Sequence, residues 1–348
     1  MKHILLPDGC SGRRLVFYLS MEEYVAANLD RIAGEGGEAF FMWQVAPTVI
    51  FGRNQVMEAE VNMPYCKEKG IQLYRRKSGG GCVYSDKGNI MLSFITPSTD
   101  VAATFERILE RLAESLRKAG LNAERSGRND ILVDGKKVSG NAYFLQPRSS
   151  IVHGTMLFDT DFEELVKAIT PSEEKIKSKG VASVRQHVTN VRPYFEKAED
   201  WTNQLTNIEI YKNYLVGEFC SAGDGIIDSI TLTAEDVWEI EEIEKGYLNP
   251  AFLEGRNHSW SVSRKSKIEG VGEVIAELEL ESGNIARCHV TGDFFALKEG
   301  VDAYLNTRLA GCPDNKEDIV ARLAGADISQ FIAGLTTDDF TGILITKD

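Results

Sequence analysis

The first hundred residues alternate apolar and polar positions in patterns that predict one helix followed by several strands. LSMEEYVAANLDRIAG carries Ser20 and, three residues later, Glu23, a spacing that predicts a capping box and a helix from about residue 21. Runs rich in β-branched and aromatic residues follow: FFMWQV, PTVIFGRNQ and IQLYRR. The nearly continuous apolar run NIMLSFIT predicts a strand that is buried on both faces.

The middle of the chain predicts an amphipathic helix and a hairpin. Between residues 105 and 116, apolar residues recur at spacings of three and four, which places them on one face of a helix that ends near Gly120. Asp134 and Gly135 lie between two apolar runs, a pattern typical of a two-residue hairpin turn, and Lys137 falls on the returning strand. Helices and strands mix without a regular β-α-β rhythm, which favours an α+β fold with a mixed sheet.

The last hundred residues predict a small separate module. The region 239–268 is charged and rich in turn formers, which is typical of a domain boundary. Beyond it, alternating apolar and polar residues flank Gly283-Asn284 and predict a half-solvated hairpin, followed by short helices at about 300–309 and 316–323. We therefore expect a large domain over residues 1–245, a linker over 246–265, and a small α+β accessory domain over 266–348.

Composition and charge narrow the classes of function. The 348 residues include 39 basic and 52 acidic side chains, and the net charge of -13 disfavours non-specific binding to nucleic acid or to an anionic membrane. No apolar run reaches the roughly 18 residues of a transmembrane helix, and the first residues do not have the pattern of a secretory signal. We expect a cytoplasmic protein. The six cysteines have no zinc-site spacing, so we expect reduced thiols that mostly pack in the interior.

A cationic, glycine-rich segment stands out against this acidic background. RRKSGGGCVYSDKGN (75–89) places Arg75, Arg76 and Lys77 directly before three adjacent glycines. Backbone N–H groups in such a segment can cradle anionic oxygens, and Arg76 can add a bidentate fork to the same anion. A plain loop or a β-bulge between two strands is the alternative. The segment does not match the Walker phosphate-binding motif.

Two further patterns suggest chemistry, each with an ordinary structural alternative. Lys137 can be an exposed strand lysine, or its ammonium can stabilise a carboxylate and a phosphate that react with each other. Asn129 and Asp130 in GRND can form a turn, or they can hold the magnesium that accompanies a nucleotide phosphate. Cys82 follows the glycines and can be a nucleophile with His153 as its base, but the apolar strand that comes next favours a packing role.

Taken together, these stretches resemble the lipoate-protein ligase A family. The resemblance rests on PTVIFGRNQ (47–55) with EVN (60–62), RRKSGGGCVYSDKGN (75–89), GRNDILVDGKKVSGNAY (127–143), HGTMLF (153–158) and KGVASVRQHVTN (179–190). Each motif alone is weak, but their order and spacing make the set specific. GDFF (292–295) resembles part of the small C-terminal domain of the family.

The resemblance implies a fold and a reaction. The fold is the one shared with biotin protein ligases and related to class II aminoacyl-tRNA synthetases. In the reaction, lipoate or octanoate and ATP with Mg²⁺ give an acyl-AMP and pyrophosphate, and a lysine of an acceptor lipoyl domain then takes the acyl group. The implied acceptors are E2 subunits of 2-oxoacid dehydrogenases and the glycine cleavage H protein. The family likeness implies no tightly bound organic cofactor, no nucleic-acid or membrane partner, and a monomer.

The resemblance also implies roles for individual residues. Lys137 would be catalytic and would bridge the lipoyl carbonyl and the α-phosphate, and Asp130 would lie near the metal. The residues implied to bind ATP and lipoyl-AMP are Arg76, Ser78, Gly79, Gly80, Gly81, Cys82, Val83, Tyr84, Asn89, Asn129, Asp130 and Lys137. Those implied to bind lipoate are Arg76, Gly80, Lys137, Ser139, Gly140, His153 and Gly154.

Two departures from the family pattern keep other functions open. Cys82 stands where the family usually has alanine, and Ser85 stands where many members have histidine. Cys82 allows a second hypothesis, an ATP-independent octanoyl or lipoyl transferase that forms a thioester. Ser85 allows a third, a lipoate-binding protein without turnover.

Overall fold

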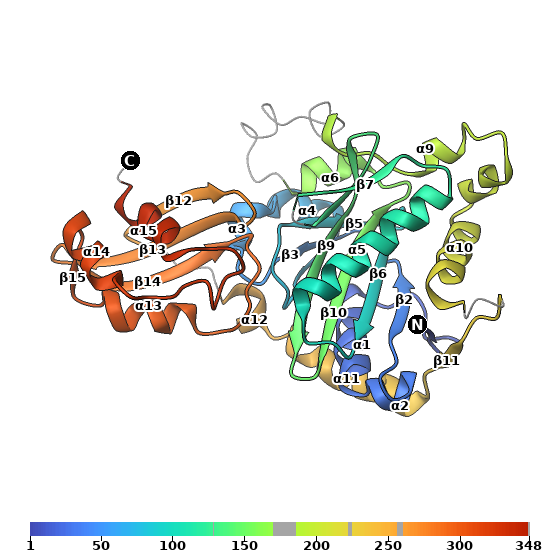
Figure 1. The fold of residues 1–348 in the computed structure, drawn as a ribbon, viewed down its shortest axis with the longest axis horizontal. Helices are drawn as coiled ribbons and strands as arrows, with labels where there is room; N and C mark the ends of the chain where they lie inside the picture. The colour runs from blue at the N-terminus through green and yellow to red at the C-terminus, as the bar shows by residue number, and fades with distance from the viewer. Residues whose placement is uncertain (128, 170–185, 222–224, 256–259, 347–348) are drawn as a thin grey trace. The chain divides into compact units, whose positions relative to one another are not determined.

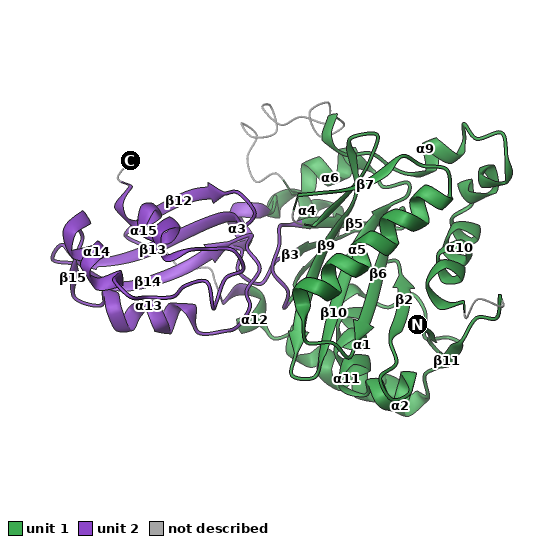
Figure 2. Ribbon diagram, in the orientation of Figure 1, with its two compact units in different colours: residues 1–50, 61–76, 83–253 green, residues 51–60, 77–82, 254–348 purple. Residues whose placement is uncertain are grey.

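The computed structural model describes residues 1–127, 129–169, 186–221, 225–255 and 260–346, which form two compact units (Figures 1 and 2). The first unit comprises residues 1–50, 61–76 and 83–253, and the second comprises residues 51–60, 77–82 and 254–348. Two short segments from the first hundred residues therefore belong to the same unit as the C-terminal part of the chain.

An eight-stranded sheet forms the centre of the first unit. Its order is β11-β1-β2-β6-β10-β9-β8-β7. The strands are β1 (Lys2–Leu5), β2 (Ala39–Trp43), β6 (Asn89–Thr96), β7 (Ala123–Ser126), β8 (Asp130–Val133), β9 (Lys136–Gln146), β10 (Ser149–Leu157) and β11 (Ser229–Thr231). β1 pairs in parallel with β2 and β11, and the other neighbours are antiparallel. The predicted α+β fold with a mixed sheet is confirmed, and every residue of β6 is buried as predicted.

Helices cover both faces of this sheet (Figure 1). α1 (Leu15–Ala27) and α11 (Ala234–Tyr247) share one apolar cluster with Phe41 of β2. On the opposite face, Phe219 of α10 (Ile208–Cys220) packs against Phe40 and Phe94, with ring centroids 5.0 and 4.9 Å away. Adjacent residues of β2 thus face different layers, as the alternation of side chains along a strand requires.

The remaining elements of the first unit are shorter, apart from one long helix. α5 (Val101–Lys118) is the predicted amphipathic helix, and its apolar stripe is buried. The others are α2 (Leu29–Ala33), α4 (Met63–Lys69), α6 (Phe162–Ala168), α9 (Arg192–Phe195), the 3-10 helix η1 (Trp201–Thr206) and α12 (Pro250–Glu254). A small sheet joins β4 (Gln72–Arg75), β3 (Thr48–Phe51) and β5 (Val83–Ser85). The glycine-rich segment connects β4 to β5, which confirms that it joins two strands.

The predicted start of the first helix is wrong. α1 begins at Leu15, and Ser20 lies inside it, where its hydroxyl donates to the Val16 carbonyl oxygen at 2.8 Å. All eight residues from 15 to 22 are buried, and the change from the polar residues 11–14 to this apolar run marks the true start of the helix. A serine followed by a glutamate three residues later is a capping signal only at a helix end.

The second unit contains a four-stranded sheet of order β12-β13-β14-β15. Its elements are α3 (Met57–Glu60), β12 (Val262–Ile268), β13 (Gly272–Glu281), β14 (Asn284–Gly292), α13 (Val301–Leu309), β15 (Cys312–Pro313), α14 (Lys316–Leu323) and α15 (Thr337–Ile345). The predicted hairpin is confirmed, with Ser282 and Gly283 at its turn (φ +51° and +81°). The two short predicted helices correspond to α13 and α14, whereas α15 was not predicted.

The expected linker range, 246–265, contains regular structure. The end of α11, the whole of α12 and the first residues of β12 lie in it. As a division between domains, the range stays a prediction. Within the described parts of the chain, none of the helices combines the length and the apolar character of a membrane span.

Candidate active site

The predicted hairpin positions Lys137 on the outer part of the main sheet. Asp134 and Gly135 form its turn with positive φ angles of 49° and 74°, so β8 returns directly as β9. The backbone of Lys137 is fixed from a second side, because its carbonyl oxygen accepts a hydrogen bond of 2.9 Å from the Thr189 N–H. Lys137 is therefore held by neighbours from two other stretches of the sequence, β8 and the residues at 188–189.

The ammonium of Lys137 forms an ion pair with Asp130. Nζ lies 2.7 Å from Oδ1, and each side chain is about one-third exposed, at 35% and 32%. The Lys137 side chain crosses directly over Gly140: a Cβ atom at that position would lie 2.8 Å from Nζ and 2.9 Å from Cε. Real Cβ contacts are essentially never this short, so the observed place of the ammonium requires glycine at 140.

A pair of asparagines, Asn129 and Asn141, fixes the start of β8, where Asp130 lies. Asn129 Nδ2 donates to the Asn141 carbonyl oxygen at 2.7 Å, and the Asn141 backbone N–H and Nδ2 donate to the Asn129 carbonyl oxygen at 3.0 and 3.1 Å. The Asn141 side chain fills the space beside Gly154, where a Cβ would lie 1.9 Å from Oδ1. The amide of Asn129 is thus committed to the backbone, which makes Asn129 a support for Asp130 in this structure.

Sequence reasoning did not find Asn141, although it lies in the GKKVSGN motif. Its neighbours were predicted site residues: Ser139 is fully buried and accepts from Asn141 Nδ2 at 3.1 Å, and the Gly140 N–H donates to the Thr155 hydroxyl at 3.1 Å. Only the register of β8, β9 and β10 brings these residues together, since Gly154 pairs with Asn141 and Asp130 pairs with Gly140.

His153 belongs to a buried polar chain that runs through the core. Its Nδ1 lies 2.7 Å from Glu22 Oε2, the Ser93 hydroxyl donates to Glu22 Oε1 at 2.6 Å, and Trp43 Nε1 donates to the Ser93 hydroxyl at 2.9 Å. Glu22 is 2% exposed and comes from α1. Sequence reasoning missed it because a glutamate within a helix is normally a surface residue. The ring of His153 is held in one orientation by this carboxylate.

Four more predicted site residues lie in or near the small sheet of the first unit. Arg76 is 6% exposed, and its Nη1 donates to the Ile50 carbonyl oxygen at 3.3 Å. Tyr84 is buried, and burial together with the nearby Asp86 carboxylate raises the pKa of its phenol. Asn89 Nδ2 makes a long contact of 3.5 Å with the Tyr84 carbonyl oxygen. Val83 precedes Tyr84 in β5 and is half-buried.

The glycine-rich segment, Ser78 to Cys82, belongs to the second unit. Its backbone lies against GDFF: a Cβ on Gly79 would lie 2.2 Å from the Phe294 carbonyl oxygen, and the Gly80 N–H donates to that oxygen over 3.4 Å. Gly80 also has a positive φ of 87°. Two glycines of the segment therefore permit a close approach of another backbone stretch.

Four cysteines are structural. Cys66, Cys220, Cys288 and Cys312 are buried, and burial raises the pKa of the Cys66 and Cys220 thiols to about 11. Such thiols are poor nucleophiles at neutral pH because little thiolate forms. Cys82 is half-buried.

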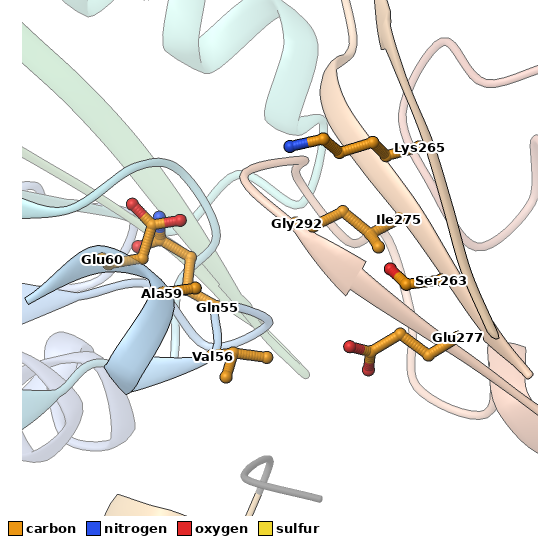
Figure 3. A pocket seen from close by; sticks show the side chains of 9 residues that line it. All are labelled: Gln55, Val56, Ala59, Glu60, Ser263, Lys265, Ile275, Glu277 and Gly292. Atoms are coloured by element: carbon orange, nitrogen blue, oxygen red, sulfur yellow. The ribbon is translucent and has the colours of Figure 1, made fainter. Parts of the chain in front are cut away.

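Two cavities in the structure contain none of the predicted site residues. The first lies within the second unit, has a volume of about 250 Å³ and is lined by polar and apolar groups that include Glu60, Lys265 and Glu277 (Figure 3). The second, of about 350 Å³, lies in the first unit beside Gly120 and Tyr194. Neither cavity is the predicted nucleotide or lipoate site.

The residues near Lys137 suit a metal ion that arrives with a nucleotide. Among the described residues, no group of three or more His, Cys, Asp or Glu side chains could hold a metal. Asp130 offers one carboxylate beside Lys137. Magnesium typically binds one or two carboxylates together with waters and substrate phosphates, so a single carboxylate fits this use.

Parts of two motifs that carry the family resemblance lie outside the described residues. Arg128 and residues 179–185 of the motif KGVASVRQHVTN are in this group. Arg125, which precedes the motif GRND in the sequence, forms ion pairs with Glu106 and Glu110 at 3.2 and 3.8 Å, which is the ordinary surface role of an arginine.

Comparison with known proteins identifies the family. The description "Lipoyl protein ligase A/B catalytic domain" matches residues 15–218, and "Bacterial lipoate protein ligase C-terminus" matches residues 257–344. The chain is 33% identical over 330 residues to lipoate-protein ligase LplJ of Bacillus subtilis, which covers 94% of this chain and 95% of that relative. The chain belongs to the lipoate-protein ligase family. The family resemblance is thus confirmed over both parts of the sequence.

Other lipoate-protein ligases support this assignment. Lipoate–protein ligase 1 of Staphylococcus aureus is 33% identical over 320 residues, 91% of this chain and 92% of its own length. Among solved structures, the bi-partite lipoate protein ligase of Thermoplasma acidophilum has a TM-score of 0.62 at 26% identity, over 75% of this chain and 98% of that chain. LipL1 of P. falciparum shares the fold, with a TM-score of 0.70 at 18% identity over 98% of this chain and 97% of its own.

Proposed function

We propose that this lipoate-protein ligase activates lipoate with ATP and then transfers the lipoyl group to a lysine of an acceptor lipoyl domain. The observation that carries the proposal is the Lys137–Asp130 ion pair laid over Gly140. It provides one accessible ammonium beside one carboxylate, on a hairpin that is fixed by several hydrogen bonds. Similarity to lipoate-protein ligases over nearly the whole chain supports the assignment.

The first step needs charge neutralisation more than acid–base chemistry. An oxygen of the lipoate carboxylate attacks the α-phosphorus of ATP, and the bond to the β-phosphate oxygen breaks, which releases pyrophosphate. Both reactants are anions, so a fixed ammonium between them lowers their repulsion and stabilises the charge that develops. We assign this role to Lys137. Asp130 would keep the ammonium in place and would lie beside the magnesium of the nucleotide complex.

In the second step, the amine of the acceptor lysine attacks the acyl carbonyl carbon of lipoyl-AMP. AMP leaves with the electron pair of the mixed anhydride bond, and the amide nitrogen loses a proton. Lys137, placed near the carbonyl oxygen, would stabilise the oxyanion of this step as well. One side chain would then serve both half-reactions.

The predicted binding residues fit these steps as follows. We propose that Arg76 and the backbone of residues 78–84 receive the phosphates and the adenine, since glycine N–H groups and a guanidinium are suited to anions. We assign Ser139, Gly140, His153 and Gly154 to the wall that receives the lipoyl group, and Asn89 to the nucleotide side. His153 would act through its fixed orientation.

The substrate and the acceptor are inferred from the relatives. A putative lipoate protein ligase from Thermoplasma acidophilum, 25% identical with a TM-score of 0.58, was solved with bound lipoic acid. The bi-partite ligase of that organism was studied together with its E2 lipoyl domain. We therefore propose lipoate as the acid, with octanoate as a possible substitute, and lipoyl domains of E2 subunits or the H protein as acceptors. We further propose that the protein is a cytoplasmic monomer.

Intact-mass analysis of an apo lipoyl domain tests the proposal. With lipoate, ATP and Mg²⁺, the acceptor should gain one lipoyl group, and leaving out ATP should abolish the gain. Full lipoylation from an acyl donor without ATP would instead support the cysteine-dependent transferase. Lipoate binding without any acceptor modification or AMP release would support the binding-protein hypothesis.

A further inference from the structure

The chain passes between the two compact units at five places, after residues 50, 60, 76, 82 and 253. Two adjacent arginines of the first unit lie at three of these passages. Arg76 is itself the last residue before one passage, and its Nη1 donates to the carbonyl oxygen of Ile50, the last residue before another. Arg75 binds the end of α12, where the chain leaves the first unit after residue 253.

Arg75 is fixed by hydrogen bonds to two consecutive carbonyl oxygens. It is 2% exposed, its Nε donates to the carbonyl oxygens of Phe252 and Leu253 at 2.9 and 3.1 Å, and its Nη2 donates to the latter at 2.9 Å. The planar guanidinium presents several N–H groups in fixed directions, so it can hold two consecutive carbonyls at once. A cation at the C-terminal end of a helix also interacts favourably with the helix dipole.

The helix that Arg75 holds depends on such support. α12 has five residues, none of them buried, and a helix of this length is not stable alone in water. On its other side, the ring of Phe252 packs edge-on against Tyr247 at 5.6 Å, and the Tyr247 hydroxyl donates to Glu23 at 2.6 Å. The end of α12 is thus held by hydrogen bonds from Arg75 at the end of β4, and by the ring contact of Phe252 with Tyr247 of α11.

We infer that Arg75 is a positioning residue of this enzyme: it fixes the end of β4, from which Arg76 and the glycine-rich segment continue. The inference rests on the proposed function. A segment that starts from a fixed point loses less conformational freedom when it binds ATP. Without Arg75, part of the binding energy of ATP is used to order the end of β4 and the beginning of the glycine-rich segment. The KM for ATP should therefore rise, while kcat stays nearly the same.

The test compares Arg75→Gln with Arg75→Lys and with a control at another buried arginine. Arg264, in β12, is 6% exposed and binds Asp314 at 2.8 and 2.6 Å and the Leu344 carbonyl oxygen, so Arg264→Gln removes a similar clamp elsewhere. In lipoate-dependent pyrophosphate exchange, we expect the KM for ATP to rise about tenfold in Arg75→Gln, with kcat within about twofold. Arg75→Lys should recover part of the KM, and Arg264→Gln should leave the KM unchanged.

Either of two kinetic outcomes would overturn the inference. One is an unchanged KM with activity lost only in proportion to the folded fraction, and the other is the same KM change in Arg264→Gln. Hydrogen–deuterium exchange supplies a second readout that does not depend on the reaction: Arg75→Gln, or Arg75→Lys if the glutamine variant does not fold, should speed exchange in both 249–254 and 76–82. Faster exchange in 249–254 alone would also refute the coupling. If the wild type has no exchange activity, the proposed function fails, and the deuterium result still decides whether Arg75 couples the two segments.

Discussion

At the scale of single residues, two glycines of the site are needed because a neighbouring side chain occupies the space of a Cβ atom, and not because they form turns. Gly140 gives room to the Lys137 ammonium, and Gly154 gives room to the Asn141 amide. The sequence singled out both glycines through family resemblance but could not supply this reason, because it depends on which residues face each other across β8, β9 and β10. Asn141 was missed for the same reason, whereas Glu22 was missed because a glutamate within a helix is normally a surface residue.

Gly140→Ala should damage catalysis far more than stability. The new methyl group would have to displace the end of a flexible lysine side chain, which costs little folding energy but moves the ammonium away from Asp130. A misplacement of about 1 Å can cost roughly a hundredfold in rate. We expect pyrophosphate exchange to fall by about that factor, while the melting temperature changes little. Gly246→Ala in α11, where nothing lies within 4 Å of the new Cβ, is the matched control and should keep full activity.

Cys82→Ala separates the ligase from the cysteine-dependent transferase. In the proposed function, residue 82 contributes its backbone, so exchange and transfer should each remain within about threefold of the wild type; a nucleophile would lose several orders of magnitude. Rates of both half-reactions are the measurement. A loss of transfer above a thousandfold in a folded variant would contradict the assignment of Lys137 as the central group.

At the scale of elements, the sequence predicts those helices and strands that have one apolar and one polar face. α5, the two hairpins, α13 and α14 were predicted because each shows its burial pattern directly. The start of α1 was placed six residues too late, because Ser20 and Glu23 have the spacing of a capping box although both lie inside the helix. No local pattern predicts that Asp236 of α11 joins α1 and α2, since that contact depends on tertiary packing.

The buried carboxylate of Asp236 links α11 to α1 and α2 through hydrogen bonds. Oδ1 accepts from the Tyr24 hydroxyl at 2.5 Å and from Arg31 Nη2 at 2.7 Å, and Oδ2 accepts from the Thr233 N–H in a capping box. Burial alone would raise the pKa of Asp236, but the hydrogen bonds from Tyr24, Thr233 and Arg31 outweigh it and lower the pKa to about 2. The ionised form is thus favoured by folding.

Asp236→Asn should lower the free energy of unfolding at pH 7 by about 2 kcal/mol. Because the folded pKa lies below the ordinary value of 3.8, this contribution is present above that value and is lost as the pH falls from about 4 to 2. Urea unfolding at pH 7, 4 and 2 should therefore show a gap between wild type and variant that narrows with acid. Glu239→Gln, an exposed change on the same helix, should stay within about 0.5 kcal/mol of the wild type. A gap that widens with acid would contradict the account.

At the scale of the whole molecule, the compact units do not follow the order of the sequence. Hydropathy predicts a division into contiguous stretches, whereas residues 51–60 and 77–82 belong to the unit of the C-terminal sheet. Their place depends on tertiary contacts such as Gly79 against Phe294 and the hydrogen bond from the Gly292 N–H to the Asn54 carbonyl oxygen at 2.9 Å. Periodicity does not encode such contacts.

The central claim is that Lys137 promotes the reaction of a lipoate carboxylate with ATP. Lipoate-dependent exchange of labelled pyrophosphate into ATP measures that step without the acceptor protein. We predict exchange in the wild type that requires lipoate and Mg²⁺, and a loss of at least about a hundredfold in Lys137→Ala, for which Lys136→Ala on the same strand is the matched control. No lipoate-dependent exchange in the folded wild type, or full exchange in Lys137→Ala, would contradict the account.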